Sequence, residues 1–155
     1  MKEVIYLVGQ ISPKYEITYQ WRIDVTERLQ TYKNIEIIDP CVNSFNENIL
    51  KEKTYAIGSA GERAVGINVL PSKDLTYVKR ANIAIVNLNQ YDPNKELLGS
   101  YFEMSWLYLH PEKTVIAFAD NLFSYNCQHP FVTQTVDTWC HDEQEACRVI
   151  ENYFV

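Results

Sequence analysis

The sequence of 155 residues contains no apolar run of 18 residues, and its first residues lead directly into a strand-like segment. We therefore expect neither a signal peptide nor a membrane span, and by default a cytoplasmic protein with no membrane partner. Basic residues are also few, because 14 Lys and Arg stand against 20 Asp and Glu, for a net charge of −6. A nucleic-acid polymer requires a basic face, so we expect no partner of that kind, although one Arg or Lys would suffice for a small ligand with a single phosphate.

No pair of cysteines has the C-x-x-C spacing, and the four cysteines are Cys41, Cys127, Cys140 and Cys147. Cys140-His141 together with Cys147 lacks a fourth metal ligand, so we predict reduced structural thiols, no metal site and no cofactor. Internal repeats and low-complexity segments are absent as well. The composition, 46% hydrophobic and 22% charged, indicates one globular domain over residues 1–155, large enough to bury a core without disulfides.

Short apolar runs alternate along the chain with segments of helical periodicity. The predicted strands are Val4–Val8, Ile35–Asp39, Ile83–Leu88, Thr114–Phe118 and a short one near Thr135–Trp139, and the predicted helices are Thr18–Tyr32, Ser72–Arg80, Ser100–Leu109 and Asp142–Phe154. Asn43–Leu70, interrupted by three glycines, is predicted to be a long loop. Because strands that are apolar throughout are buried on both faces, the alternation favours an α/β fold, doubly wound around a five-stranded parallel sheet of order 2-1-3-4-5.

In a sheet of that order the ligand site lies beyond the carboxyl ends of strands one and three. The segments that leave those strands are Gly9–Pro13 and Asn89–Glu103, so we expect them to meet. The second segment ends at the start of a predicted helix, where the spacing Ser100-x-x-Glu103 fits a capping box with a purely structural role. Alternatively, Glu103 is a nucleophile that the helix N-terminus keeps ionised although it is partly buried.

Four features of the sequence extend this second interpretation. They are Ile5-Tyr-Leu-Val-Gly9; Trp21-Arg22 followed by Asp39-Pro40; Asp74-Leu75 followed by Ala81-Asn-Ile-Ala-Ile-Val86; and Gly99-Ser-Tyr-Phe-Glu103. Together they resemble the nucleoside 2-deoxyribosyltransferase family, in its phage and bacterial forms, over residues 4–118, and the last two features are the most specific. The resemblance implies a flavodoxin-like fold and an enzyme that transfers a 2-deoxyribosyl group between nucleobases. The partners it implies are a nucleoside or nucleotide, a free base and further copies of the chain in a homo-oligomer.

The resemblance also implies a covalent mechanism. Glu103 would attack C1′ of a 2′-deoxynucleoside, expel the base and hold the deoxyribosyl group until a second base attacks from the vacated face. Two displacements give retention, and an oxocarbenium-like transition state favours an anion below the sugar ring. Asp74 would be the second catalytic carboxylate, close to the base and its proton, with Asp92 or Glu96 as a third.

The residues that bind the substrate are assigned by the same resemblance. Tyr6 would orient Glu103 or pack beside the sugar, and Gly9 with Gln10 would line the base pocket. The full set of substrate-binding candidates is Tyr6, Gly9, Gln10, Arg22, Asp92, Gly99 and Ser100.

Each assignment has a structural alternative. Asp74 in the first turn of its helix would merely interact with the helix dipole, and Asp92 before Pro93 would be ordinary turn chemistry. Tyr6, in the middle of a strand, would be a core residue. Arg22 would be a solvated helix residue rather than a ligand of phosphate.

Two other functions remain open, and the sequence also departs from the family, including around His129–Val132, where the Asn and Met that a neighbouring subunit lends to the sugar have no clear match. Ser105 stands where many members have Gly, and Leu97 where they have Asp, so part of the sugar or base network is expected to differ. A nucleoside 5′-monophosphate N-glycosidase would use the same nucleophile with water as acceptor and would need a phosphate clamp, for which Ser12, Arg22 and Ser100 are the candidates. A non-catalytic nucleotide-binding protein is the third function, since a fold does not determine a function.

A cluster of aromatic and apolar residues in polar surroundings indicates a surface that another protein chain covers. Its members are Tyr108, Leu122, Phe123, Tyr125 and Phe131. We expect the partner to be a second copy of the chain, so that the protein is at least a dimer.

Overall fold

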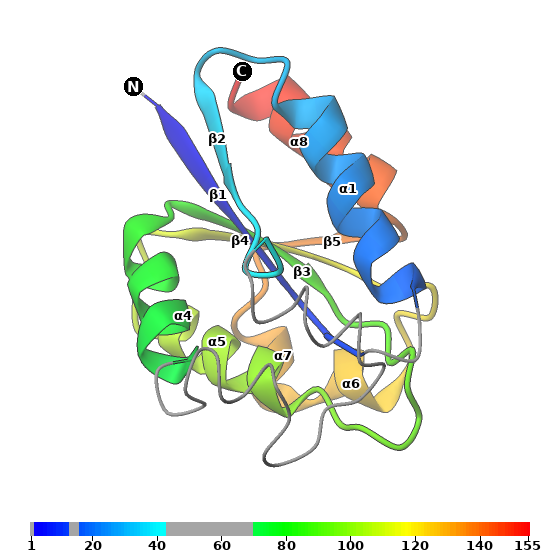
Figure 1. Cartoon of the computed structure of the whole chain (residues 1–155). Coiled ribbons are helices and arrows are strands. Elements are labelled where there is room, and N and C mark those ends of the chain that lie inside the picture. The colour runs from blue at the N-terminus through cyan, green and yellow to red at the C-terminus, as the bar shows by residue number, and fades with distance from the viewer. Residues whose placement is uncertain (1, 13–15, 43–69) are drawn as a thin grey trace.

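The computed structural model describes residues 2–12, 16–42 and 70–155. At its centre is a sheet of strand order β2-β1-β3-β4-β5, formed by β1 (Glu3–Gly9), β2 (Ile35–Ile38), β3 (Ile83–Asn87), β4 (Thr114–Phe118) and β5 (Thr138–Cys140) (Figure 1). Every neighbouring pair of strands is parallel, and β1 lies between β2 and β3. The structure confirms the predicted flavodoxin-like α/β fold and its strand order.

Helices cover both faces of this sheet. One face carries α1 (Ile17–Leu29) and α8 (Glu143–Tyr153), and the other carries α4 (Leu70–Arg80), α5 (Leu98–Tyr108), α6 (Tyr125–Gln128) and α7 (Pro130–Thr133) (Figure 1). Side chains along β1 alternate between the two layers. Ile5 and Leu7 pack with α1 and α8, whereas Tyr6 and Val8 pack with the residues of the opposite layer. The face that holds Tyr6 is therefore the one shared with α4 and α5.

Local sequence explains where α8 begins. The carboxylate of Asp142 accepts the backbone N–H of Glu145 at 2.7 Å, and the carboxylate of Glu145 accepts the backbone N–H of His141 at 2.7 Å. These reciprocal bonds satisfy two donors at the helix start, as in a capping box. The capping pattern that the sequence suggested for α5 is thus found at α8.

The connection between β4 and β5 differs from the prediction. Residues 125–133 form the short helices α6 and α7, and β5 follows at Thr138–Cys140 instead of near Thr135–Trp139. The hydroxyl of Ser124 accepts the N–H of Cys127 at the start of α6, and Pro130 is the first residue of α7, a position that suits proline because it needs no N–H donor there. The loop predicted over Asn43–Leu70 lies outside the described residues, apart from Leu70 itself.

Two further findings concern the described part of the chain as a whole. None of its helices is both long and apolar enough to cross a lipid bilayer. The four cysteines are free, and three of them, all except Cys41, are buried.

Candidate active site

The carboxyl ends of β1 and β3 lie side by side, since Gly9 pairs with Asn87 at the last position of both strands. β2 lies on one side of β1 and β3 on the other, so the strand order reverses at β1. Doubly wound sheets bind their ligands at such a reversal. Three titratable side chains interact on the α4 and α5 face: Tyr6 from β1, Asp74 from α4 and Glu103 from α5.

Glu103 does not cap α5. The helix begins at Leu98, so Ser100 lies inside it and Glu103 belongs to its second turn, and the N-cap residue Leu97 makes no side-chain bond. The helix begins upstream of Ser100, and its N-cap residue Leu97 is 2% exposed and packs in the core. Instead of capping, the carboxylate of Glu103 accepts a hydrogen bond from the hydroxyl of Tyr6 in a buried environment. The capping-box interpretation is wrong.

The environment of Glu103 favours its protonated form. Burial raises the pKa of Glu103 to about 8, and the neighbouring Asp74 carboxylate acts in the same direction. The hydrogen bond from Tyr6 and the positive charges of Arg22 and Lys73 oppose this rise. Burial and then the charge of Glu103 raise the pKa of the Tyr6 phenol far above its usual value, so Tyr6 remains a hydrogen-bond donor throughout the working pH range.

Asp74 presents a carboxylate oxygen that receives no hydrogen bond from the described residues. Its Oδ1 is buried without a hydrogen-bond partner among them, and the Nζ of Lys73 is 3.9 Å from that oxygen. Burial raises the pKa of Asp74, and Lys73 partly offsets the effect. Asp74 also lies in the second turn of α4, so the helix-dipole explanation is wrong. A buried carboxylate oxygen without a hydrogen bond lowers the stability of the folded protein. A ligand that donates a hydrogen bond to this oxygen would reduce that loss.

Two site residues were missed at the sequence level, Lys73 and Tyr77. The Nζ of Lys73 lies 5.5 Å from the ring centroid of Tyr77, and the ring of Tyr77 lies 5.8 Å from that of Tyr6. Lys73 and Tyr77 are four residues apart on α4 and therefore share a face with each other. This spacing, together with the position of Lys73 next to the candidate catalytic residue Asp74, could have indicated both residues from the sequence.

Arg22 is 1% exposed, so the expectation of a solvated helix residue is wrong. Its Nη2 donates to the carbonyl of Gly9 at 2.9 Å and its Nη1 to the carbonyl of Thr18 at 3.1 Å. Its Nε is 3.4 Å from Asp39 Oδ1 without a hydrogen bond, and its guanidinium carbon lies 4.4 Å from the ring centroid of Trp21. Arg22 thus ties the end of β1 to α1 and β2. An enclosed guanidinium with these bonds is not placed as a phosphate ligand.

Gly9 and Gln10 also have structural roles in this geometry. A Cβ atom at Gly9 would lie 3.0 Å from Trp21 Cζ2 and 3.1 Å from Asn87 Cβ, which explains the glycine by packing. Gln10 accepts the N–H of Asp92 at 2.7 Å and donates to the carbonyl of Lys95 at 2.7 Å. The segments that leave β1 and β3 therefore meet, as predicted.

Asp92 is fully buried and contributes to this junction. It accepts hydrogen bonds from Ser12 Oγ at 3.2 Å and from the N–H of Asn94 at 3.1 Å. These bonds support a role in holding the loop after β3 against the end of β1. Its contact with substrate continues to rest on the family resemblance.

The remaining candidates are spread around the start of α5. Gly99 is exposed, and the space that a Cβ atom would take there is open, whereas Ser100 is 4% exposed. Glu96 is exposed and lines a different pocket on the far side of α5. Ser12, Arg22 and Ser100 are all buried, so they do not present a phosphate clamp. Within the described ranges, no three His, Cys, Asp or Glu side chains gather as metal ligands.

No protein-family model matches the chain, and no curated protein matches it either. Among solved structures, the chain is similar to the crystal structure of a conserved protein from Enterococcus faecalis V583, with a TM-score of 0.64. The two chains are 13% identical, and the similarity covers 98% of this chain and 99% of the other. At that identity the comparison shows a shared fold over the whole chain.

Proposed function

We propose that the protein transfers a 2-deoxyribosyl group between nucleobases and that Glu103 is its nucleophile. The observation that supports this most directly is the buried carboxylate of Glu103, which accepts a hydrogen bond from the Tyr6 hydroxyl on the face of the sheet that α4 and α5 cover. Asp74, on the neighbouring helix α4, supplies a second carboxyl group, whose Oδ1 receives no hydrogen bond from the described residues. Two carboxyl groups with distinct environments are what a double displacement at an anomeric carbon requires.

In the first displacement, the Glu103 carboxylate forms a bond to C1′ while the bond from C1′ to the base nitrogen breaks. The electron pair leaves with the base, which takes a proton from Asp74. Burial raises the pKa of Asp74 and so favours the protonated form that this step needs. In the second displacement, another base attacks C1′, Glu103 leaves as the carboxylate, and Asp74 recovers a proton from the incoming base. Tyr6 donates to the carboxylate and fixes its orientation in both steps.

The raised pKa of Glu103 has a direct consequence for this chemistry. With a pKa of about 8, about one tenth of the free enzyme carries an ionised Glu103 at pH 7. Positive charge that develops on the sugar in the transition state stabilises the anion, so ionisation and bond breaking favour each other. The positive charge of Lys73, which opposes the rise in pKa, acts in the same sense.

The geometry favours a nucleoside over a nucleoside 5′-monophosphate. The three residues considered for a phosphate clamp are buried, and the guanidinium of Arg22 binds two backbone carbonyls. A phosphate would have to displace those bonds, whereas an uncharged 5′-hydroxyl group makes no such demand. Hydrolysis with water as acceptor would use the same Glu103 and is the outcome that competes with transfer.

Chromatography of a 2′-deoxynucleoside incubated with a different free base tests the proposal. We expect a new deoxynucleoside with the unmodified chain, and a loss of at least about a thousandfold in turnover with Glu103→Gln, which keeps the shape but removes the anion. Glu27→Gln, on the exposed face of α1, is the matched control and should remain active. Mass spectrometry with a 2-fluorinated deoxynucleoside should place the sugar adduct on Glu103.

Three results would each point elsewhere. Release of free base without a new nucleoside would indicate the hydrolase, and an adduct on another carboxylate would reject Glu103 as nucleophile. Binding of nucleosides without any turnover would indicate the non-catalytic protein.

The outer face of α5 supports the further proposal of a homo-oligomer. Leu98, Phe102 and Leu109 are 60%, 58% and 71% exposed, and between Leu97 and Leu109 the sole charged residue is Glu103, which is buried. Such a helix face, apolar on the outside, is typical of a surface that another chain covers. Of the aromatic cluster noted in the sequence, Tyr108, Tyr125 and Phe131 are exposed but line a pocket, so Phe123, which is 88% exposed, is the member that adds to this support.

A further inference from the structure

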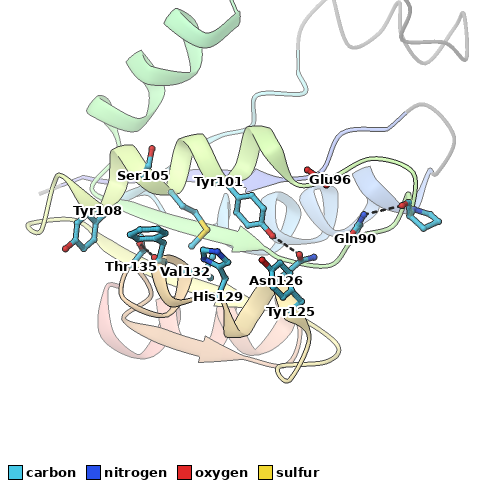
Figure 2. A pocket seen from close by; sticks show the side chains of 13 residues that line it. Gln90, Glu96, Tyr101, Ser105, Tyr108, Tyr125, Asn126, His129, Val132 and Thr135 are labelled. Atoms are coloured by element: carbon cyan, nitrogen blue, oxygen red, sulfur yellow. Dashed lines mark hydrogen bonds between the residues drawn. The ribbon is translucent and has the colours of Figure 1, made fainter.

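A pocket that does not include Glu103 in its lining, which we call the second pocket, lies beside α5 (Figure 2). It has a volume of about 610 Å³ and is enclosed by α5, the loop before it, and the short helices α6 and α7. Tyr101 and Ser105, two residues before and after Glu103, line this pocket, and positions two apart lie on opposite sides of a helix. Its volume falls in the range of pockets that take small organic ligands.

The walls of this second pocket are mostly aromatic. Tyr101 and Tyr108 come from α5, and three rings come from the α6–α7 segment. The rings of Tyr125 and His129 have centroids 5.7 Å apart at 79°, and those of His129 and Phe131 are 5.7 Å apart at 30°. The hydroxyl of Tyr101 donates to Asn126 Oδ1 at 2.6 Å, which fixes that ring against α6. Such walls suit a flat ring that stacks on one aromatic side chain and meets the edge of another.

The fixed charge that the described residues contribute to the pocket lining is negative. Among the described residues, Glu96 is the only Asp or Glu that lines the pocket, and none of them contributes a Lys or Arg. A smaller hollow of about 340 Å³ shares Gln90, Tyr125 and Asn126 with the pocket, and the one charged residue of its described lining is Asp120. The whole chain carries a net charge of −6. The electrostatic potential in this region therefore favours a cation, and π faces attract cations as well.

We infer that the second pocket binds a flat organic cation, namely a positively charged nitrogen heterocycle. Its ring lies among the aromatic walls, with its positive charge toward the carboxylate of Glu96. The adjoining hollow accommodates a polar substituent, which Asp120 and the neighbouring amide and hydroxyl groups can bind. This site is separate from Glu103 and does not depend on deoxyribosyl transfer. An anionic ligand, including one with a phosphate group, finds no Lys or Arg among the described lining residues.

Two bicyclic ions of similar size and opposite charge, 1-methylquinolinium and 1-naphthoate, test this inference by isothermal titration calorimetry. We expect 1-methylquinolinium to bind with a Kd below about 1 mM and at least about tenfold more tightly than 1-naphthoate. Equal affinity for the two ions, or no binding of the cation at millimolar concentration, would overturn the inference.

Matched variants locate the binding. Phe131→Ala removes a lining ring and should weaken cation binding about fivefold, whereas Phe123→Ala removes an exposed ring outside both hollows and should leave the Kd unchanged. Glu96→Gln should weaken binding about threefold, with Glu112→Gln as its neutral control, because an exposed ion pair contributes modestly. Ser105→Phe, which fills the pocket from an exposed helix position, should abolish binding. If instead the mass in solution falls with Phe131→Ala and the cation has no effect, the pocket is an interface between two copies and the inference is wrong.

Discussion

The buried carboxyl group of Glu103 should make the folded protein less stable as pH rises, and Glu103→Gln should remove that dependence. Burial raises the pKa of Glu103 from 4.5 to about 8 in the folded chain. Between these two values the unfolded chain releases a proton that the folded chain retains, so the free energy of unfolding decreases with increasing pH. The stabilisation is fully present below about pH 4.5 and is lost as pH approaches 8.

The size of this effect follows from the shift in pKa. Each unit corresponds to about 1.4 kcal/mol, so the destabilisation is about 1 kcal/mol at pH 5 and about 4 kcal/mol at pH 7.5. Gln keeps the shape of the side chain but has no ionisation to suppress. The difference in unfolding free energy between Glu103→Gln and the unmodified chain should therefore grow by about 3 kcal/mol in favour of the variant between pH 5 and pH 7.5.

Urea unfolding at several pH values, followed by circular dichroism, measures this difference. A constant offset between the two curves would reflect altered hydrogen bonding to Tyr6, so only the dependence on pH is diagnostic. The exposed control Glu27→Gln should run parallel to the unmodified chain. If the curve of Glu103→Gln is also parallel, the carboxyl group titrates normally and the argument about its burial fails. If Glu103→Gln is more stable at neutral pH yet inactive, then Glu103 lowers the stability of the protein but is required for its activity.

Four other outcomes are expected. In the transfer assay, kcat/KM should give a bell-shaped pH profile with its upper inflection near pH 8, because the first step needs Glu103 ionised and Asp74 protonated, and a profile that keeps rising above pH 8 would contradict this. Tyr6→Phe removes a hydrogen bond that lowers the pKa of Glu103, so the inflection should move to higher pH; an unchanged or lower inflection would argue against that bond. Phe102→Glu should reduce the mass measured by light scattering to that of a monomer, and a monomeric unmodified chain would refute the oligomer. Arg22→Met should lower the unfolding free energy by about 3 kcal/mol in urea, against less than about 1 kcal/mol for the exposed Arg80→Met, and equal losses would show that burial of Arg22 adds nothing.

The sheet was predictable because its signals are local and repeated. β3 is buried at all five positions and β4 at four of five, and such runs, separated by helical periodicity, define a parallel sheet without knowledge of any contact. The helices α6 and α7 have four residues each, which is too short for a periodic pattern to be recognised. Their start signals, Ser124 and Pro130, are single residues that occur equally well in loops.

The sequence suggested only part of the side-chain cluster around Glu103 and little of its hydrogen bonding. The resemblance placed Glu103 near Tyr6 and Asp74, and the structure brings these three together. The burial of Arg22 could not be read from its helix, because the carbonyl of Gly9 that binds it belongs to the backbone, and backbone groups leave no mark in the sequence. The second pocket was invisible for a related reason, since its rings come from three elements whose packing only the fold defines.

The position of β1 between β2 and β3 also affects how the chain folds during synthesis. β1 is made first, but β3, one of its two neighbours in the sheet, begins at Ile83, about 44 residues after the end of β2 at Ile38. At about 5–20 residues per second, a ribosome needs about 2–9 s to synthesise that interval. Throughout this time β1 has an open edge and apolar side chains on both faces, which is the condition under which nascent strands pair wrongly or recruit chaperones. The protein should therefore be most vulnerable to aggregation while residues 39–82 are being translated, well before Glu103 exists.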